Sequence, residues 1–205
     1  MAHVLAVSDV EDDVLCARLA SGSLGPVDVV VSCGDLRPGY LDYVATMANA
    51  PLVYVRGNHD TDEAGYADCG GIPLDMTLER IADLAFVGLD GSIDYREDIV
   101  GYSEARMAAR ATVLAAKAKL MGGVDVLVCH TPPRGYGDMD DLPHRGFKCY
   151  NRLLKVLRPK IMLSGHVHLN YGMGKREHEH PSGARIINAY GYWYGEIGPQ
   201  SLPST

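Results

Sequence analysis

The residues of this sequence that could do chemistry stand directly after short apolar runs. Five such runs end in carboxylate, amide or imidazole side chains, which are Asp9 with Glu11, Asp35, Asn58 with His59, His130, and His166 with His168. A single polar side chain after a strand is usually a cap or a satisfied core group. Because the same feature follows five runs of one chain, it indicates a shared site.

These side chains form a mixed donor set of carboxylates, an amide oxygen and imidazoles, with no thiolate. Such a set suits Mn²⁺, Fe or Zn²⁺ better than a cysteine-based structural zinc site. It is too large for one open catalytic ion and sufficient for two, which would lie roughly 3.5–4 Å apart across a bridging carboxylate. The sequence therefore predicts two divalent metal ions, foremost Mn, with Fe, Zn or Mg as alternatives.

The apolar runs predict the strands that would position these ligands. We expect strands over 3–8, 27–32, 52–55, 84–89, 124–129 and 160–164. Apolar spacing predicts helices over 11–19, from Pro38 onward, over 103–121 and over 147–157. Strands alternating with helices indicate right-handed βαβ units in a largely parallel α/β sheet, whose ligands lie past the carboxyl ends of the strands.

The spacing within the motifs supports the expectation that these side chains converge on one site. Residues two apart in an extended segment face the same way, so Asp9 with Glu11, and His166 with His168, can each reach one site. A glycine, which permits a tight turn, directly precedes three of the candidate ligands. These glycines are Gly34, Gly57 and Gly165.

The remaining segments lack a clear hydrophobic period. Residues 61–83 and 90–102 are expected to be loops, and 171–175 could pair with 185–189 as antiparallel strands. The turn between them contains His178-Glu179-His180, which we interpret as a solvated turn rather than another metal motif. A loose tail is expected over 198–205.

Length, composition and charge limit the kinds of protein that this chain can be. With 205 residues and 47% hydrophobic composition, the chain predicts one domain over 1–205. The net charge of −7 argues against non-specific binding to nucleic acid or to an anionic membrane. Five cysteines, an odd number, suggest reduced thiols. With neither a signal peptide nor a membrane span in the sequence, we expect a soluble, cytoplasmic protein.

In their order, the motifs resemble the signature of the calcineurin-like metallophosphoesterases. They are Asp-x-Glu, Gly-Asp, Gly-Asn-His-Asp, a lone His and Gly-His-x-His, between Asp9 and His168. The resemblance implies a four-layer α/β/β/α sandwich of two mixed sheets with helices outside and metals at one edge. It also implies hydrolysis of a phosphomonoester or phosphodiester, of a small molecule, by attack of a metal-bound water.

The resemblance also assigns roles to single residues. Asp9 and His168 would hold the first metal, Asp35 would bridge, and the second metal would be held by Asn58, His130 and His166. His59 would be a catalytic, non-ligand histidine that steadies the transition-state oxygens or protonates the leaving group. Asp60 would orient His59.

One position departs from the family pattern, because Glu11 stands where the first motif usually has a histidine. As a hard oxygen ligand, Glu11 would shift the first site toward Mn²⁺ or Mg²⁺. Alternatively it turns away into the adjacent helix and leaves a weaker first site. We favour ligation, since the spacing from Asp9 permits it.

Other side chains are candidates for binding a small phosphorylated substrate. Arg37 follows Gly-Asp closely, and Arg134, His144 and Arg145 lie in the irregular stretch after His130. For Arg56 we favour a surface arginine. A different class of function is a non-catalytic scaffold for protein partners, with the segment from Tyr190 to Tyr194 as a partner surface, a homo-oligomer contact or part of the core.

Overall fold

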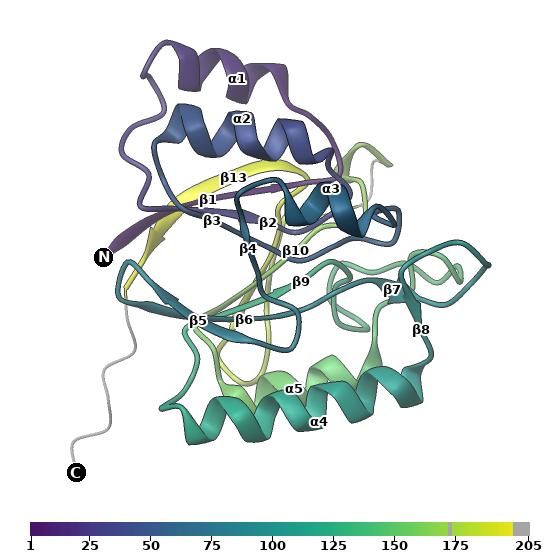
Figure 1. The fold of residues 1–205 in the computed structure, drawn as a ribbon. Helices are drawn as coiled ribbons and strands as arrows, with labels where there is room; N and C mark the ends of the chain where they lie inside the picture. Colours follow the sequence, from purple (N-terminus) through teal and green to yellow (C-terminus); the bar gives the residue numbers. More distant parts are fainter. Residues whose placement is uncertain (172–173, 199–205) are drawn as a thin grey trace.

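The computed structural model describes residues 1–171 and 174–198. Two sheets pack face to face, and helices cover the outer face of each (Figure 1). This confirms the predicted four-layer α/β/β/α sandwich.

The first sheet has the strand order β13-β1-β2-β3-β4. Its strands are β1 (Ala2–Ser8), β2 (Val29–Ser32), β3 (Leu52–Tyr54), β4 (Ile72–Pro73) and β13 (Gly191–Ile197). The first four are parallel, and β13 runs antiparallel to β1. The helices α1 (Asp13–Ala20) and α2 (Pro38–Ala48) lie over this sheet (Figure 1). The segment from Tyr190 to Tyr194 is therefore largely an edge strand.

The second sheet has the strand order β11-β12-β10-β9-β6-β5. Its strands are β5 (Leu78–Ile81), β6 (Leu84–Leu89), β9 (Val126–Cys129), β10 (Ile161–Ser164), β11 (Glu177–Glu179) and β12 (Arg185–Asn188). The four central strands are parallel, and the two edge strands are antiparallel. The helices α4 (Glu104–Leu120) and α5 (Lys148–Leu157) cover its outer face.

The strands are continuous apolar runs because both of their faces are buried. One face of each sheet meets the other sheet, with Val4, Val53 and Leu163 among the buried side chains between them. The opposite faces pack on the helices, as Leu5 does in the first sheet and Leu127 in the second. This double burial fixes the register of every central strand, and hence the position of the residue that follows it.

Two expected loops contain short elements. Residues 61–83 include α3 (Glu63–Ala67), β4 and β5, and the α3 helix begins at Asp62, whose side chain accepts the Gly65 N–H. Residues 90–102 include β7 (Ser92–Ile93) and β8 (Gly101–Tyr102), which pair in parallel. Elements this short carry too few residues for a period to be detected.

The predicted strand over 171–175 is wrong. Leu169–Tyr171 is a single 3-10 turn, residues 172–173 lie outside the described part of the chain, and the partner of β12 is β11, Glu177–Glu179. The prediction of a solvated turn at His178-Glu179-His180 is wrong as well. Two of these residues are in β11, and His180 is buried. Except for Gly198, the tail predicted to be loose also lies outside the described residues. Within those residues, no helix has both the length and the apolar character needed to cross a membrane.

Candidate metal centre

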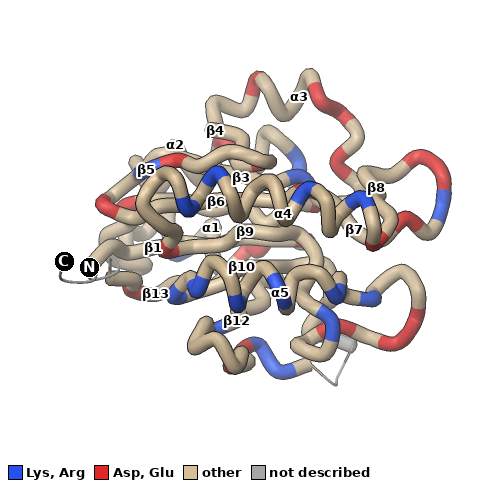
Figure 2. Tube along the Cα trace, turned by 90° about the horizontal axis from the view of Figure 1, so that it is seen from below, with Lys and Arg blue, Asp and Glu red and all other residues tan. Residues whose placement is uncertain are grey.

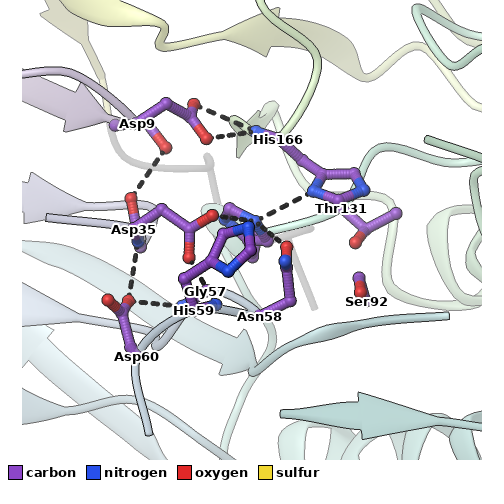
Figure 3. Close-up of polar contacts among 12 residues, drawn as sticks. Asp9, Asp35, Gly57, Asn58, His59, Asp60, Ser92, Thr131 and His166 are labelled. Atoms are coloured by element: carbon purple, nitrogen blue, oxygen red, sulfur yellow. Dashed lines mark hydrogen bonds and ion pairs between the residues drawn. The ribbon is translucent and has the colours of Figure 1, made fainter. Parts of the chain in front are cut away.

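The predicted ligands other than Glu11 meet at one edge of the two sheets. Figure 3 shows Asp9, Asp35, Asn58 and His166 directed toward one another from the loops that follow four different strands. Donor atoms of Asp9, Asp35 and His130 all lie within 4.8 Å of one another. The topology therefore brings together side chains that are as much as 157 residues apart.

Three of the candidate ligands have left-handed backbone. The φ angles are 67° for Asp9, 56° for Asp35 and 69° for His166. Such a conformation costs a non-glycine residue about 1–3 kcal/mol and persists only when surrounding contacts impose it. Here the Asp9 N–H donates to the Gly34 carbonyl at 3.1 Å, and the His166 N–H donates to the Asp9 carboxylate at 2.9 Å.

Two glycines at the centre allow the ligand loops to approach closely. A Cβ at Gly57 would lie 2.1 Å from Asp35 Oδ1, and one at Gly165 would lie 1.9 Å from Ser8 Oγ and 2.5 Å from Asp9 Oδ2. No side chain fits at these positions without moving a candidate ligand.

We predict that Gly165→Ala destabilises the fold by about 1–3 kcal/mol, as overpacking does in a close-packed interior. The control is Gly39→Ala in α2, where an added Cβ meets nothing within 4 Å and should stabilise by about 0.5–1 kcal/mol. Denaturant unfolding of both variants measures the difference. Equal stability of the two would contradict the close approach.

The two buried histidines are held in the way that metal-ligating histidines usually are. His130 Nδ1 lies 2.8 Å from the Cys33 carbonyl, and His166 Nε2 lies 2.6 Å from the Pro143 carbonyl. Because a carbonyl only accepts, each of these nitrogens carries the proton. The other nitrogen of each ring faces the cluster, with His166 Nδ1 3.1 Å from His130 Nε2. This is the orientation that a backbone carbonyl imposes on a metal ligand.

The charges at the centre are of the kind that a bound cation would balance. Burial raises the pKa of Asp9. Burial also raises that of Asp35, but the charge and hydrogen bond of His130 outweigh it and hold the pKa below its usual range. For His130, burial lowers the pKa while Asp35 raises it, to about 9. Burial and the neighbouring His130 lower the pKa of His166 to about 3. The buried carboxylates thus draw a proton onto His130, in the position where a metal ion would supply the positive charge.

The amide of Asn58 is also oriented toward the cluster. Its Oδ1 lies 2.9 Å from His130 Nε2, and its Nδ2 donates to the Tyr95 hydroxyl at 3.3 Å. His168 lines the same cleft, and its ring lies 4.7 Å from that of Tyr190. Together with the histidine orientation and the buried carboxylates, this donor set fits divalent metal ions.

Glu11 points away from the cluster and toward Arg37. The Glu11 carboxylate accepts hydrogen bonds from Arg37 Nε at 2.7 Å and from Arg37 Nη2 at 2.6 Å. This pair lowers the pKa of Glu11 through the hydrogen bonds from Arg37. The Arg37 side chain is 82% exposed, so water screens the pair and it can open readily. Ligation by Glu11 therefore stays a prediction, and it requires Arg37 to release the carboxylate.

Substitution of Glu11 tests that prediction. We expect Glu11→His to tighten zinc binding at the first site, because an imidazole is a better zinc ligand than a paired carboxylate. Arg37→Met, which frees the carboxylate, should tighten Mn²⁺ binding instead. Titration of the metal-free proteins with each ion measures both effects. If neither substitution changes metal content or selectivity, Glu11 is not a ligand.

The catalytic candidates His59 and Asp60 do not contact each other as expected. The Asp60 carboxylate accepts the N–H groups of Asp35 at 2.6 Å and Gly57 at 2.7 Å, so it joins two ligand loops instead of orienting the His59 ring. His59 Nδ1 lies 3.3 Å from Nη2 of Arg96. The His59 N–H donates to Asp35 Oδ1 at 2.8 Å.

A cleft of about 580 Å³ opens onto the centre. The predicted site residues that line it are Asp9, Asp35, Arg37, Asn58, His59, Asp60, His144, His166 and His168. His130 lies fully buried beneath them. Arg134 and Arg145 are not among the residues that line the cleft; Arg134 pairs with Asp138 and Asp140, and Arg145 donates to the Asp140 carbonyl.

Sequence reasoning did not identify Tyr95 and Arg96, which contact Asn58 and His59. They lie in the stretch between β7 and β8, where no motif or period marks them. It also assigned Arg56 to the surface. The side chain of Arg56 is only 19% exposed, and its Nε donates to the buried Asp90 carboxylate at 2.9 Å.

Comparison with known proteins gives a family match over most of the chain. A family model described as calcineurin-like phosphoesterase matches residues 13–170. A curated relative, UPF0046 protein T07D4.2 of Caenorhabditis elegans, is 46% identical over 52 residues, which are 24% of this chain and 13% of the relative. The chain therefore matches only a small part of that relative.

One solved structure shows the same fold. It aligns with 96% of this chain and 97% of its own length at a TM-score of 0.71 and 15% identity. An archaeal phosphodiesterase aligns with 72% of this chain and 85% of its own length, at 21% identity and a TM-score of 0.42. At these sequence identities the similarity concerns the fold alone. Only the structure with a TM-score of 0.71 is similar enough to support an argument about the fold.

Proposed function

The chain belongs to the calcineurin-like phosphoesterases, and from that premise we propose that it is a dinuclear-metal phosphoesterase of small molecules. The observation that carries this proposal is the orientation of His130 and His166. Each ring donates one N–H to a backbone carbonyl and turns its other nitrogen inward. The inward nitrogen of His130 faces the Asp9 and Asp35 carboxylates, and that of His166 lies 3.1 Å from it. A centre that was only structural would have no need to direct a buried ring nitrogen at two carboxylates.

The proposed ligand assignment follows the motifs. Asp9 and His168 would hold one ion, Asp35 would bridge, and the other ion would be held by Asn58, His130 and His166. When bound, two divalent ions would lower the pKa of a bound water and neutralise a phosphoryl group, with Mn the first candidate. His59, at the open side of the centre, would donate a hydrogen bond to the reacting phosphoryl oxygens.

The size and charge of the protein favour a small substrate. The cleft volume of about 580 Å³ lies in the range of small-molecule sites, roughly 300–1,000 Å³. Figure 2 shows many of the basic residues along α4 and α5, and acidic residues on the loops near β7 and β8. Arg37 and His144 line the cleft and are the remaining candidates for binding the substrate phosphate.

The test is hydrolysis of bis-p-nitrophenyl phosphate and of p-nitrophenyl phosphate by the full chain with added Mn²⁺. Turnover of either supports a phosphoesterase, and the better substrate separates a diesterase from a monoesterase. Two bound metal ions without turnover of either would contradict the proposal and favour the scaffold.

A further inference from the structure

We propose that the groove between α4 and α5 is a docking site for an acidic amphipathic helix of a protein partner. The groove lies between the two helices that cover the outer face of the second sheet, and its lining residues are different from those of the cleft at the metal centre. The proposal goes beyond the phosphoesterase function and does not depend on it. It is carried by the shape and lining of the groove and by the charge around it.

Two helices that lie side by side form the groove (Figure 1). The Glu104 carboxylate at the start of α4 accepts the N–H groups of Lys148 at 3.1 Å and Cys149 at 2.7 Å, which holds the starts of both helices together. The groove has a volume of about 300 Å³, and its α4 side extends from Ala108 to Lys119. That distance is roughly 16 Å along the helix axis, or three helical turns. A space of this shape between two helices matches the ridge of a third.

The lining of the groove is largely aliphatic. Ala111, Ala115 and Leu153 are almost completely buried and belong to the apolar core of the second sheet, whereas Val156 is 37% exposed. On α4 the lining positions recur three or four residues apart, as Ala108, Ala111 and Ala115 do, so they form one face of the helix. The apolar core of the second sheet therefore reaches the surface of the protein between the two helices.

The charge around the groove is opposite to that of the chain as a whole. The helices α4 and α5 contain seven lysines and arginines and a single acidic residue, Glu104, so their net charge is +6. The whole chain has a net charge of −7. Figure 2 shows the basic residues spread along both helices. The groove is thus a basic surface on an acidic protein.

Four of these cations form no ion pair with the carboxylates of residues 1–171 and 174–198. Lys119 and Arg152 line the groove. Lys148 and Lys155 lie about one helical turn to either side of Arg152, and all three side chains are exposed on α5. Their positive charge is therefore available to the acidic side chains of a partner.

An aliphatic groove with a basic rim is complementary to an acidic amphipathic helix. Such a helix places apolar residues three and four positions apart in the groove, and its flanking aspartates and glutamates meet the cations of the rim. A membrane surface fits less well, because it takes up apolar side chains that protrude from a protein and not a hollow. Nucleic acid also fits less well, because its phosphates gain nothing from an aliphatic floor.

The test is the binding of a synthetic probe to the full chain. The probe is a fluorescently labelled, stapled helical peptide of about 14 residues, which is long enough to fill the groove. It carries leucines three and four residues apart with glutamates beside them. Fluorescence anisotropy should show saturable binding that weakens as salt is added. The same peptide with lysines in place of the glutamates should bind at least about 10-fold more weakly.

Two substitutions and their matched controls locate the bound probe. Thr112→Trp fills the groove and Arg152→Glu reverses one charge of its rim, and each should weaken binding by about 10-fold or more. The controls are Val113→Trp and Arg106→Glu, which make the same kinds of change at exposed positions of α4 outside the groove. Both controls should bind the probe as wild type does. All four positions are exposed, so the variants should fold.

Absence of binding at about 1 mM acidic peptide would overturn the proposal. So would binding that Thr112→Trp leaves unchanged, or a lysine peptide that binds as tightly as the glutamate peptide. Vesicles of phosphatidylserine and phosphatidylcholine are tested in parallel. If the vesicles bind and the peptide does not, the surface is a lipid-binding one and the proposal fails. The measurement uses neither metal nor turnover, so its result stands whether or not the phosphoesterase function does.

Discussion

His59→Ala is expected to lower kcat on bis-p-nitrophenyl phosphate about 10²–10³-fold, the usual effect of removing one donor to a transition-state oxyanion. The reason is its position: His59 is exposed in the cleft, its backbone N–H is bound to Asp35, and its ring is held by Arg96 and not by a ligand loop. Steady-state kinetics with saturating Mn²⁺ measure the effect.

Metal content separates this effect from a damaged centre. His59→Ala should bind as much Mn²⁺ as wild type, because the His59 ring is not part of the donor cluster of Asp9, Asp35 and His130. His3→Ala is the matched control, since His3 lies near the other end of β1 and contacts Asp28. Full activity of His59→Ala with full metal content would show that the histidine takes no part in turnover.

Asp35→Asn is expected to remove metal binding and turnover together. The substitution keeps the shape of the side chain and removes one of the two carboxylate charges in the cluster. Loss of an outer partner of a metal ligand already lowers affinity about 10–100-fold, and loss of a bridging ligand should cost more. Calorimetric titration with Mn²⁺ measures the affinity.

The matched control for that substitution is Asp42→Asn, on the exposed side of α2. It makes the same change of charge far from the centre and should leave binding unchanged. An Asp35→Asn protein that binds two ions with wild-type affinity would exclude Asp35 as the bridge.

Much of the fold is predictable from the sequence because the main elements are strongly patterned. The run from Leu84 to Leu89 is apolar throughout, and in α5 the apolar residues Tyr150, Leu153, Leu154 and Leu157 all fall on one face and are buried. The helix α4 begins at Ser103, whose side chain accepts the Arg106 N–H, as its residue type suggests.

The position of the candidate ligands is also predictable, since parallel strands deliver their ends to one edge. What a sequence cannot show is which partner a flexible side chain takes. Glu11 lies two residues from Asp9, and from that spacing its side chain could face the metal centre. In the structure the Glu11 carboxylate is bound instead by Arg37, which is 26 residues further along the chain. That ion pair depends on the turn after β2, which no local pattern defines.

The contacts of Tyr95 and Arg96 are unpredictable for a related reason. Their segment is placed by backbone hydrogen bonds to the Asn58 loop, some 40 residues earlier, and backbone groups leave no trace in residue type. The strand β11 is similar, because it is three residues long and is formed only by pairing with β12.

The central claim, a metal-dependent phosphoesterase, is tested most directly by removing and restoring the metal. Protein stripped with a chelator and freed of it should not hydrolyse bis-p-nitrophenyl phosphate, and turnover should return as Mn²⁺ is added, reaching its maximum at two ions per chain. Turnover that persists after the metal is removed, or a chain that binds two ions and remains inactive on both nitrophenyl substrates, would contradict it.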